Sequence, residues 1–268
     1  MKHYNTVLTI AGSDCSGGAG IQADIKAISA LGGYAASAIT AVTVQNTVGV
    51  TAVHPVPADI VEGQIRAVLD DIGAKAIKIG MLQSAEIVLL IARLIKEYDI
   101  RNVVLDPVMV STSGHRLIEE TAISALQTEL IPPLTRVITP NIPEAEILLD
   151  GNAITLQEDM PQAVKALSQR YHTSVLLKAG HLTEDNLVDY FYDAEQDELT
   201  LLPSVRVHTR NTHGTGCTMS SAFATLLAQG NTLQQSAKGA KEYISQAIIA
   251  GADYDIGKGH GPVNHFFQ

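Results

Sequence analysis

The sequence predicts an α/β protein whose central sheet is mostly parallel and is covered by helices on both faces. Two observations carry this prediction. Short β-branched and apolar runs alternate with helical periodicities, and polar residues follow the ends of successive strand-like runs. No Pro/Ser-rich linker, internal repeat or low-complexity segment interrupts this alternation. We therefore expect residues 1–268 to form a single domain, and the 46% hydrophobic content supplies a sizeable core.

In the first half of the chain, β-branched runs and one-sided apolar periodicity identify the elements. Strands are expected at 6–11, 35–44, 49–56, 75–79 and 103–105. Helices are expected at 21–31, 58–71, 85–98 and 119–130. The second of these helices directs one apolar face toward the core, made of Ile60, Ile65, Val68 and Leu69.

The second half of the chain continues the same alternation. Strands are expected at 136–139 and 174–177, and a β-hairpin or meander at 187–192 and 199–207. Helices are expected at 144–149, at 160–171, up to about residue 227, and at 233–249. The penultimate helix has apolar residues spaced i, i+3, i+4, i+7 and i+8, namely Met219, Ala222, Phe223, Leu226 and Leu227.

Composition and charge exclude several classes of protein. The net charge of −10 disfavours non-specific nucleic-acid binding, and the absence of Trp leaves little material for base stacking. The two cysteines, Cys15 and Cys217, have no metal-ligand spacing. No signal peptide is evident, and no apolar run approaches the roughly 20 residues of a membrane span. We expect a cytoplasmic protein with neither a nucleic-acid nor a membrane partner.

A glycine-containing turn at 211–218 runs directly into the penultimate helix. The first N–H groups of a helix lack partners within it, and the helix dipole adds positive potential. Gly214, Thr215 and Gly216 therefore predict an anion pocket, most often for phosphate. Cys217 would lie in the first helical turn, where the dipole gives a thiol thiolate character. The alternatives are an ordinary loop-to-helix junction and a cysteine that packs as a small apolar residue.

A second glycine-rich stretch, at 12–20, separates the first strand from the first helix. It contains neither the dinucleotide fingerprint nor the P-loop motif. We expect it to shape a pocket at the carboxyl end of the strand; the alternative is a flexible turn without a ligand. Asp24 lies one turn into the helix, where it would point back at that pocket or simply stabilise the helix N-terminus.

Polar residues follow the carboxyl ends of the expected strands, which meet at one edge of a parallel sheet. Acids, a lysine and an anion pocket at this edge suit phosphoryl transfer from a magnesium nucleotide. Taken singly, Glu144 would be a first-turn acid, Lys178 a solvated side chain and Asp106 a turn former. The residues at these ends are Gly12, Gln45, Gly80, Met81, Asp106, Asn141, Glu144 and Lys178.

The chain contains six longer motifs in this order: TIAGSD at 9–14, SGGAGIQAD at 16–24, AVTVQNT at 41–47, KIGML at 78–82, TPNIPEA at 139–145 and NTHGTGCT at 211–218. Together they resemble the hydroxymethylpyrimidine/phosphomethylpyrimidine kinases of thiamine biosynthesis, a family with the ribokinase-like fold. The resemblance implies a three-layer α/β/α sandwich, a homodimer, and two reactions that use ATP and Mg²⁺. The first phosphorylates 4-amino-5-hydroxymethyl-2-methylpyrimidine, and the second converts its monophosphate to the diphosphate.

The resemblance also implies roles for the site residues. Gly214, Thr215 and Gly216 would form an anion hole together with the Cys217 N–H. Cys217 stands where most ribokinase relatives carry an aspartate base, and it would accept the proton of the substrate alcohol. Lys178 would bridge the phosphates of donor and acceptor. The magnesium nucleotide would be organised by Asn141 and Glu144, with Asp106 in the same metal environment.

Substrate choice is expected to depend on Gln45, because a carboxamide offers a donor and an acceptor side by side to an aminopyrimidine edge. Met81, otherwise a core residue, would cover the flat ring together with Val108. Remaining contacts would come from Gly12, the Val44 backbone and Asp24. One alternative is a pyridoxal/pyridoxine kinase of the same fold, whose substrate lacks the amino group. A second is a regulatory nucleotide-binding protein without turnover, against which Cys217 and Lys178 argue.

Overall fold

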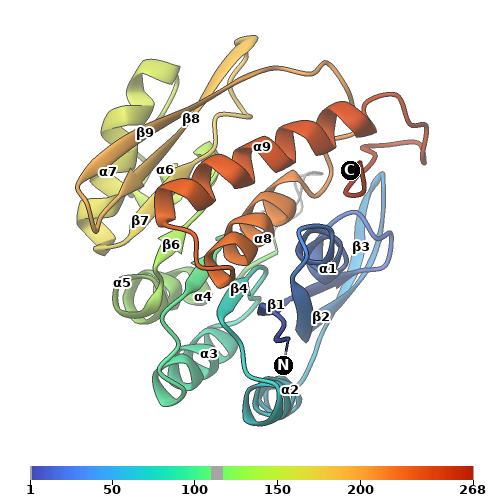
Figure 1. The fold of residues 1–268 in the computed structure, drawn as a ribbon, viewed down its shortest axis with the longest axis vertical. Helices are drawn as coiled ribbons and strands as arrows, with labels where there is room; N and C mark the ends of the chain where they lie inside the picture. The colour runs from blue at the N-terminus through green and yellow to red at the C-terminus, as the bar shows by residue number, and fades with distance from the viewer. Residues whose placement is uncertain (1, 110–116, 268) are drawn as a thin grey trace.

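A computed structural model describes residues 2–109 and 117–267, which form a sheet of nine strands between two layers of helices (Figure 1). The strand order is β3-β2-β1-β4-β5-β6-β7-β8-β9. Neighbouring strands from β2 to β7 are parallel, whereas β3, β8 and β9 add antiparallel edges. The strands are β1 (Thr6–Asp14), β2 (Tyr34–Asn46), β3 (Gly49–Pro55), β4 (Ala76–Ile79), β5 (Val103–Leu105), β6 (Val137–Ile138), β7 (Ser174–Leu177), β8 (Asn186–Asp193) and β9 (Glu198–Val205).

Alternate residues of the central strands point to opposite faces of the sheet and divide the core in two. In β1, Leu8 and Ile10 belong to one cluster and Val7 to the other. The Val7 face is covered by α1 (Gly20–Ala30), α8 (Thr215–Ala228) and α9 (Leu233–Gly251). The Leu8 face is covered by α2 (Ala58–Asp71), α3 (Ala85–Glu97), α4 (Glu120–Ala125), α5 (Ile131–Leu134), α6 (Ile142–Leu148) and α7 (Met160–Tyr171). The predicted layered α/β fold is confirmed.

Two predicted elements differ from the structure for identifiable reasons. The first strand continues past residue 11, because Ser13 pairs with Val42 and Asp14 with Thr43 after a register shift. The helix expected at 119–130 is divided into α4, a π-helical turn at Leu126–Leu130, and α5. The division lies just before Pro132 and Pro133, which have no N–H to donate to the preceding turn.

The longest helix in the described part of the chain is α9, with 19 residues. Within residues 2–109 and 117–267, no helix combines the length and the apolar character needed to cross a membrane. The helix α8 begins beside the carboxyl ends of the central strands (Figure 1). This junction between the sheet and α8 positions the site described below.

Candidate active site

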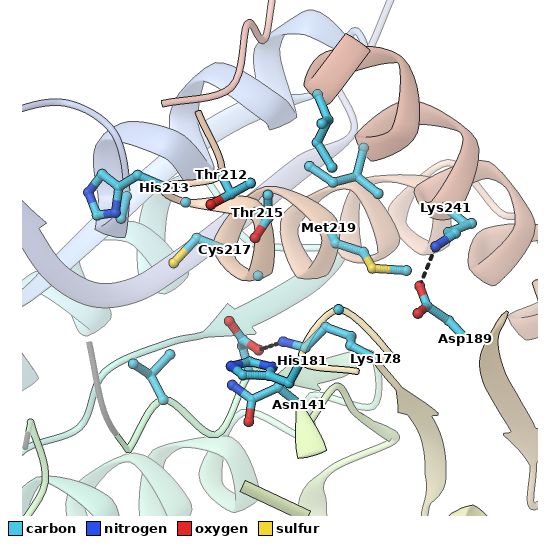
Figure 2. Close-up of a pocket in the computed structure, with 18 of the residues that line it drawn as sticks. Asn141, Lys178, His181, Asp189, Thr212, His213, Thr215, Cys217, Met219 and Lys241 are labelled. Carbon is cyan, nitrogen blue, oxygen red and sulfur yellow. Dashed lines mark hydrogen bonds and ion pairs between the residues drawn. The ribbon is translucent and has the colours of Figure 1, made fainter. Parts of the chain in front are cut away.

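A cavity of about 1410 Å³ lies at the carboxyl ends of the parallel strands. Segments from both halves of the chain line it, as expected for the edge of a parallel sheet. Figure 2 shows Asn141, Lys178 and His181 on one wall and the start of α8, with Thr215 and Cys217, on the wall opposite. The cavity lining contains most of the predicted site residues: Gly12, Gln45, Met81, Asp106, Val108, Asn141, Glu144, Lys178, Gly214, Thr215, Gly216 and Cys217.

The anion cradle is the N-terminus of α8, which starts at Thr215 after Gly214. Gly214 has a φ of +80°, and a Cβ there would collide with the Gly18 carbonyl group. A Cβ on Gly216 would lie 3.1 Å from Lys178 Nζ and 3.2 Å from Asp106 Oδ2. The first turn of α8 therefore lies close to the lysine ammonium group, and a helix N-terminus beside a cation is an arrangement that favours binding of a phosphoryl group.

We expect Gly214→Ala to lower the free energy of unfolding by about 1–3 kcal/mol, because both its positive φ and the Gly18 contact oppose a side chain. The distorted cradle should also cost about tenfold or more in phosphorylation rate. Urea unfolding and a kinase assay measure the two effects. The matched control is Gly63→Ala in α2, where nothing lies within 4 Å of an added Cβ. Equal behaviour of the two variants would contradict the close approach at Gly214.

Lys178 is held at the end of β7 by an ion pair with Asp106, whose Oδ1 lies 2.8 Å from Nζ. The same Asp106 oxygen accepts a hydrogen bond of 3.0 Å from Thr139 Oγ1. Burial lowers the pKa of Lys178, but the charges of Asp106 and Glu144 outweigh it and raise that pKa overall. The ammonium group therefore remains charged at the cradle.

Asn141 and Glu144 form a capping box at the start of α6. Asn141 Oδ1 accepts from the Glu144 N–H at 2.9 Å, and Glu144 Oε2 accepts from the Asn141 N–H at 2.8 Å. Burial raises the pKa of Glu144 to about 7; Lys178 lowers it and Asp106 raises it. Glu144 is thus an acid in the first turn of a helix, as the alternative interpretation holds, and it also lines the cavity.

Cys217 lies in the first turn of α8, but the expected thiolate character is wrong for this structure. Burial raises the pKa of its thiol to about 11; Lys78 and the Gly20 backbone lower it, while Asp24 and Asp106 raise it. Desolvation of the thiolate therefore outweighs the helix dipole. At neutral pH, Cys217 is a thiol beside the cradle.

Two predicted substrate contacts do not belong to the described cavity lining. Asp24 is fully buried, and its carboxylate accepts from Lys78 Nζ at 2.8 and 2.9 Å, from Ser221 Oγ at 2.8 Å and from Thr9 Oγ1 at 2.6 Å. Val44 is 58% exposed, and its carbonyl accepts from Thr51 Oγ1. Strand alternation places the Val44 side chain away from the cavity, whereas Thr43 and Gln45 line it, and the Val44 backbone, through which the contact was predicted, does not line it either.

Sequence reasoning missed a polar cluster that reaches the mouth of the cavity. His213 directly precedes the cradle, and its Nε2 lies 2.9 Å from Asp14 Oδ2 and 3.2 Å from the Gln45 side chain. At the far end of the cavity, Lys241 of α9 pairs with Asp189 at 2.6 Å (Figure 2). The sequence does contain a signal for the cluster of His213 and Asp14, because His213 lies within the glycine turn and Asp14 lies at the end of a strand.

The fold and the cavity together define a class of protein. A helix N-terminus with a lysine beside it, carboxylates and an amide at the same sheet edge, and space for two ligands are the features of a small-molecule kinase of the ribokinase-like fold. The family model described as phosphomethylpyrimidine kinase matches residues 14–264, so the chain belongs to the phosphomethylpyrimidine kinase family.

Curated relatives agree with this assignment over nearly the whole chain. A hydroxymethylpyrimidine/phosphomethylpyrimidine kinase of Rhizobium meliloti is 49% identical, with 97% of each chain covered. The thiamine biosynthesis bifunctional protein ThiED of Geobacter sulfurreducens is 47% identical over 97% of this chain, but the chain spans only 52% of that relative. The chain therefore corresponds to about half of the bifunctional Geobacter sulfurreducens relative and to nearly all of the Rhizobium meliloti relative.

Solved structures give the same fold. A phosphomethylpyrimidine kinase of Clostridium difficile 630 is 42% identical, with a TM-score of 0.78 over 91% of this chain and 99% of that one. A pyridoxal kinase of Bacillus subtilis in complex with ADP is 36% identical, with a TM-score of 0.89 over 98% and 97%. The predicted ribokinase-like fold and family are confirmed, and pyridoxal kinases are structural neighbours, as the alternative function anticipated.

Proposed function

We propose that the chain phosphorylates 4-amino-5-hydroxymethyl-2-methylpyrimidine and then its monophosphate, using ATP, in thiamine biosynthesis. The observation that carries the proposal is the position of Gly216 in the α8 cradle against Lys178 and Asp106, within the same cavity as Gln45. A cavity of about 1410 Å³ exceeds what a single small ring needs, so it accommodates a nucleotide beside the pyrimidine.

The residues present fit Mg²⁺ bound with the nucleotide phosphates. Among the described residues, no cluster of three or more His, Cys, Asp or Glu side chains could hold a metal ion alone. Mg²⁺ commonly takes one or two carboxylates together with phosphate oxygens and water, and Asp106 and Glu144 supply such carboxylates at the cradle. When bound, the metal ion neutralises charge on the transferred phosphoryl group.

In the first reaction, the substrate hydroxyl oxygen forms a bond to the γ-phosphorus while the bond to the bridging oxygen of ADP breaks. The N–H groups at Gly214–Cys217 and the Lys178 ammonium group stabilise the charge on the phosphoryl oxygens. Cys217, as the thiolate, accepts the hydroxyl proton. Because its pKa is raised to about 11, only a small fraction of the enzyme carries this base at neutral pH.

In the second reaction, the acceptor is a phosphate monoester. Its oxygens carry a charge of about −1.5 to −2 at pH 7, so attack on the γ-phosphorus requires no proton acceptor. The cradle and Lys178 serve this step as they serve the first. Cys217 therefore distinguishes the two reactions, whereas Lys178 is common to both.

Gln45→Met is expected to raise the KM for the aminopyrimidine about tenfold or more and to leave the KM for pyridoxine within about threefold. Methionine keeps the length of the side chain but removes the donor and the acceptor that face the aminopyrimidine edge. Steady-state kinetics with both substrates measure the change in preference. An unchanged ratio of the two kcat/KM values would mean that other residues recognise the ring.

The alternative function is phosphorylation of pyridoxal or pyridoxine; several structural neighbours of 31–36% identity are named pyridoxal kinases. A kinase assay with Mg-ATP and three acceptors separates the two proposals. We expect turnover of the hydroxymethylpyrimidine and of its monophosphate, with pyridoxine as a side substrate. Turnover of pyridoxine alone would overturn the proposed function.

A homodimer, a cytoplasmic location and one kinase domain over residues 1–268 complete the proposal. The continuous sheet supports the single domain, and a free catalytic thiol is kept reduced in the cytosol.

The outer face of β2 and the turn that follows expose Val42, Val44 and Val48, which support a dimer contact. Light scattering should give twice the chain mass, and Val44→Lys should give the single-chain mass; a wild-type monomer would contradict the dimer.

A further inference from the structure

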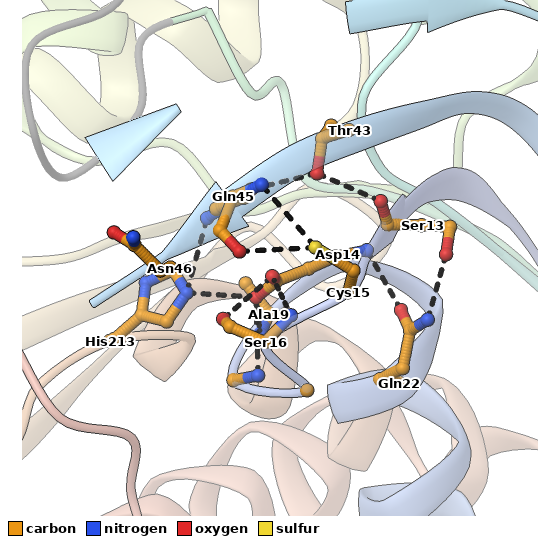
Figure 3. Close-up of polar contacts among 12 residues, drawn as sticks. Ser13, Asp14, Cys15, Ser16, Ala19, Gln22, Thr43, Gln45, Asn46 and His213 are labelled. Atoms are coloured by element: carbon orange, nitrogen blue, oxygen red, sulfur yellow. Dashed lines mark hydrogen bonds and ion pairs between the residues drawn. The ribbon is translucent and has the colours of Figure 1, made fainter. Parts of the chain in front are cut away.

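The Asp14 carboxylate organises the polar cluster at the mouth of the cavity (Figure 3). Its Oδ1 accepts from the Ser16 N–H at 2.8 Å and from Ser16 Oγ at 2.7 Å, and its Oδ2 accepts from the N–H groups of Gly18 at 3.1 Å and Ala19 at 2.8 Å. Burial raises the pKa of Asp14, but the hydrogen bonds from His213, Ser16 and Ala19 outweigh it and lower the pKa to about 2. Asp14 is therefore an acceptor only.

His213 is consequently a donor at Nε2, which lies 2.9 Å from Asp14 Oδ2. The same nitrogen lies 3.2 Å from Gln45 Nε2. A carboxamide nitrogen is also a donor only, so this orientation of Gln45 brings two donors face to face.

The opposite end of the Gln45 side chain has a matching conflict. Thr43 Oγ1 lies 3.1 Å from Gln45 Oε1 and 2.9 Å from the Ser13 carbonyl oxygen. A threonine hydroxyl has one proton and cannot donate it fully to both oxygens. Rotation of the carboxamide by about 180° replaces the donor–donor contact with a carbonyl oxygen that shares the His213 N–H with Asp14 Oδ2, and it turns the –NH₂ group toward Thr43 Oγ1, which then accepts from Gln45 while donating to Ser13.

We propose that His213 is a positioning residue for substrate recognition: it holds the Gln45 carbonyl oxygen toward itself and the Gln45 –NH₂ group toward Thr43. This inference rests on the proposed function. In this orientation, the carbonyl oxygen accepts from the exocyclic amino group of the pyrimidine, and the –NH₂ group donates to the adjacent ring nitrogen.

The assignment also orients the reacting group. In the proposed substrate, the hydroxymethyl carbon is attached beside the amino-bearing carbon and away from the paired ring nitrogen. Placing the amino group on the His213 side therefore places the hydroxymethyl group on that side as well. His213 directly precedes Gly214, where the anion cradle begins. Recognition of the ring and delivery of its hydroxyl group are thus coupled through one hydrogen-bond chain.

The test uses a 4-oxo analogue of the pyrimidine, in which the donor and acceptor along the ring edge are exchanged. Wild type should bind the amino form at least about tenfold more tightly than the oxo form, since a fixed carboxamide matches one pattern only. His213→Leu removes the donor and frees the carboxamide to rotate, so this ratio should fall to about threefold or less. His213→Gln carries an N–H donor near the position of Nε2 and should restore most of the ratio.

Competition binding measures the ratio, and kinetics with pyridoxine give a second readout. A role in folding alone would change both substrates alike, whereas positioning of Gln45 should raise the KM for the aminopyrimidine and leave pyridoxine within about threefold. If His213→Leu fails to fold, His213→Asn keeps a polar side chain that is too short to place a donor at the Nε2 position, and it should reduce the ratio similarly. If the folded variants keep the wild-type ratio of affinities for the amino and oxo forms, His213 does not position Gln45. If wild type does not phosphorylate the aminopyrimidine at all, the proposed function is wrong instead.

Discussion

Lys178→Met should lower kcat for both phosphorylations by about a thousandfold. The ammonium group lies 2.8 Å from Asp106 Oδ1 and beside the N–H groups of the α8 cradle, where the phosphoryl group is proposed to be transferred. Methionine fills a similar volume but provides no charge for the phosphoryl oxygens. Steady-state kinetics with the alcohol and with the monophosphate as separate acceptors measure both steps.

The variant also leaves Asp106 without its cation in a buried position, which is a second reason for lost activity. Two controls separate the causes. Lys178→Arg keeps the charge and should retain more activity than Lys178→Met. Adding Asp106→Asn to Lys178→Met removes the unpaired carboxylate and should restore stability in urea without restoring kcat. A loss confined to one of the two steps would show that Lys178 does not serve a shared transition state.

Most of the site could be predicted because the topology determines which residues meet. Once a parallel sheet is inferred, the residues after its strands are known to share an edge, whatever their separation along the chain. This is why Asp106, Asn141 and Lys178 were brought together correctly. The start of α8 was equally predictable, because glycines before an amphipathic helix indicate a cradle of free N–H groups.

The errors concern the direction and the environment of side chains, which sequence periodicity does not resolve near element ends. Asp24 faces the sheet, where the fully buried Lys78 of β4 requires a counter-charge. That requirement was visible in the sequence as one lysine within the apolar run Ala76–Ile79. His213 was overlooked because its partner Asp14 lies 199 positions earlier, and only the folded chain places the two side by side.

The thiolate expected at Cys217 is wrong because two opposing effects act on the thiol and the sequence shows only one of them. A helix N-terminus favours a thiolate, but removal of the thiolate from water disfavours it more strongly at this depth. Cys217 lies in the first turn of α8, which packs against α1, and a single helix motif does not reveal this packing. The resulting pKa of about 11 gives the mechanism a measurable signature.

Cys217→Ala should slow phosphorylation of the alcohol by about 10²–10⁴-fold and leave phosphorylation of the monophosphate within about threefold. Only the alcohol has a proton to lose before it attacks. In wild type, the thiolate fraction rises with pH until the thiol pKa of about 11 is reached. The rate of the alcohol step should therefore increase about tenfold per unit between pH 7 and pH 9, while the monophosphate step stays nearly flat.

Cys217→Asp is the decisive companion variant, because an aspartate is already ionised at pH 7 in most environments. It should recover part of the alcohol activity lost in Cys217→Ala, and the rise of the rate with pH should disappear with the thiol. Nucleotide binding by both variants, measured by calorimetry, shows whether the cradle remains intact. A steep pH dependence that persists in Cys217→Asp would assign the titrating base to another group, and full alcohol turnover in Cys217→Ala would remove the thiol from the mechanism. The two phosphorylations thus serve as internal controls for each other, since they share the cradle and Lys178 and differ in their need for a proton acceptor.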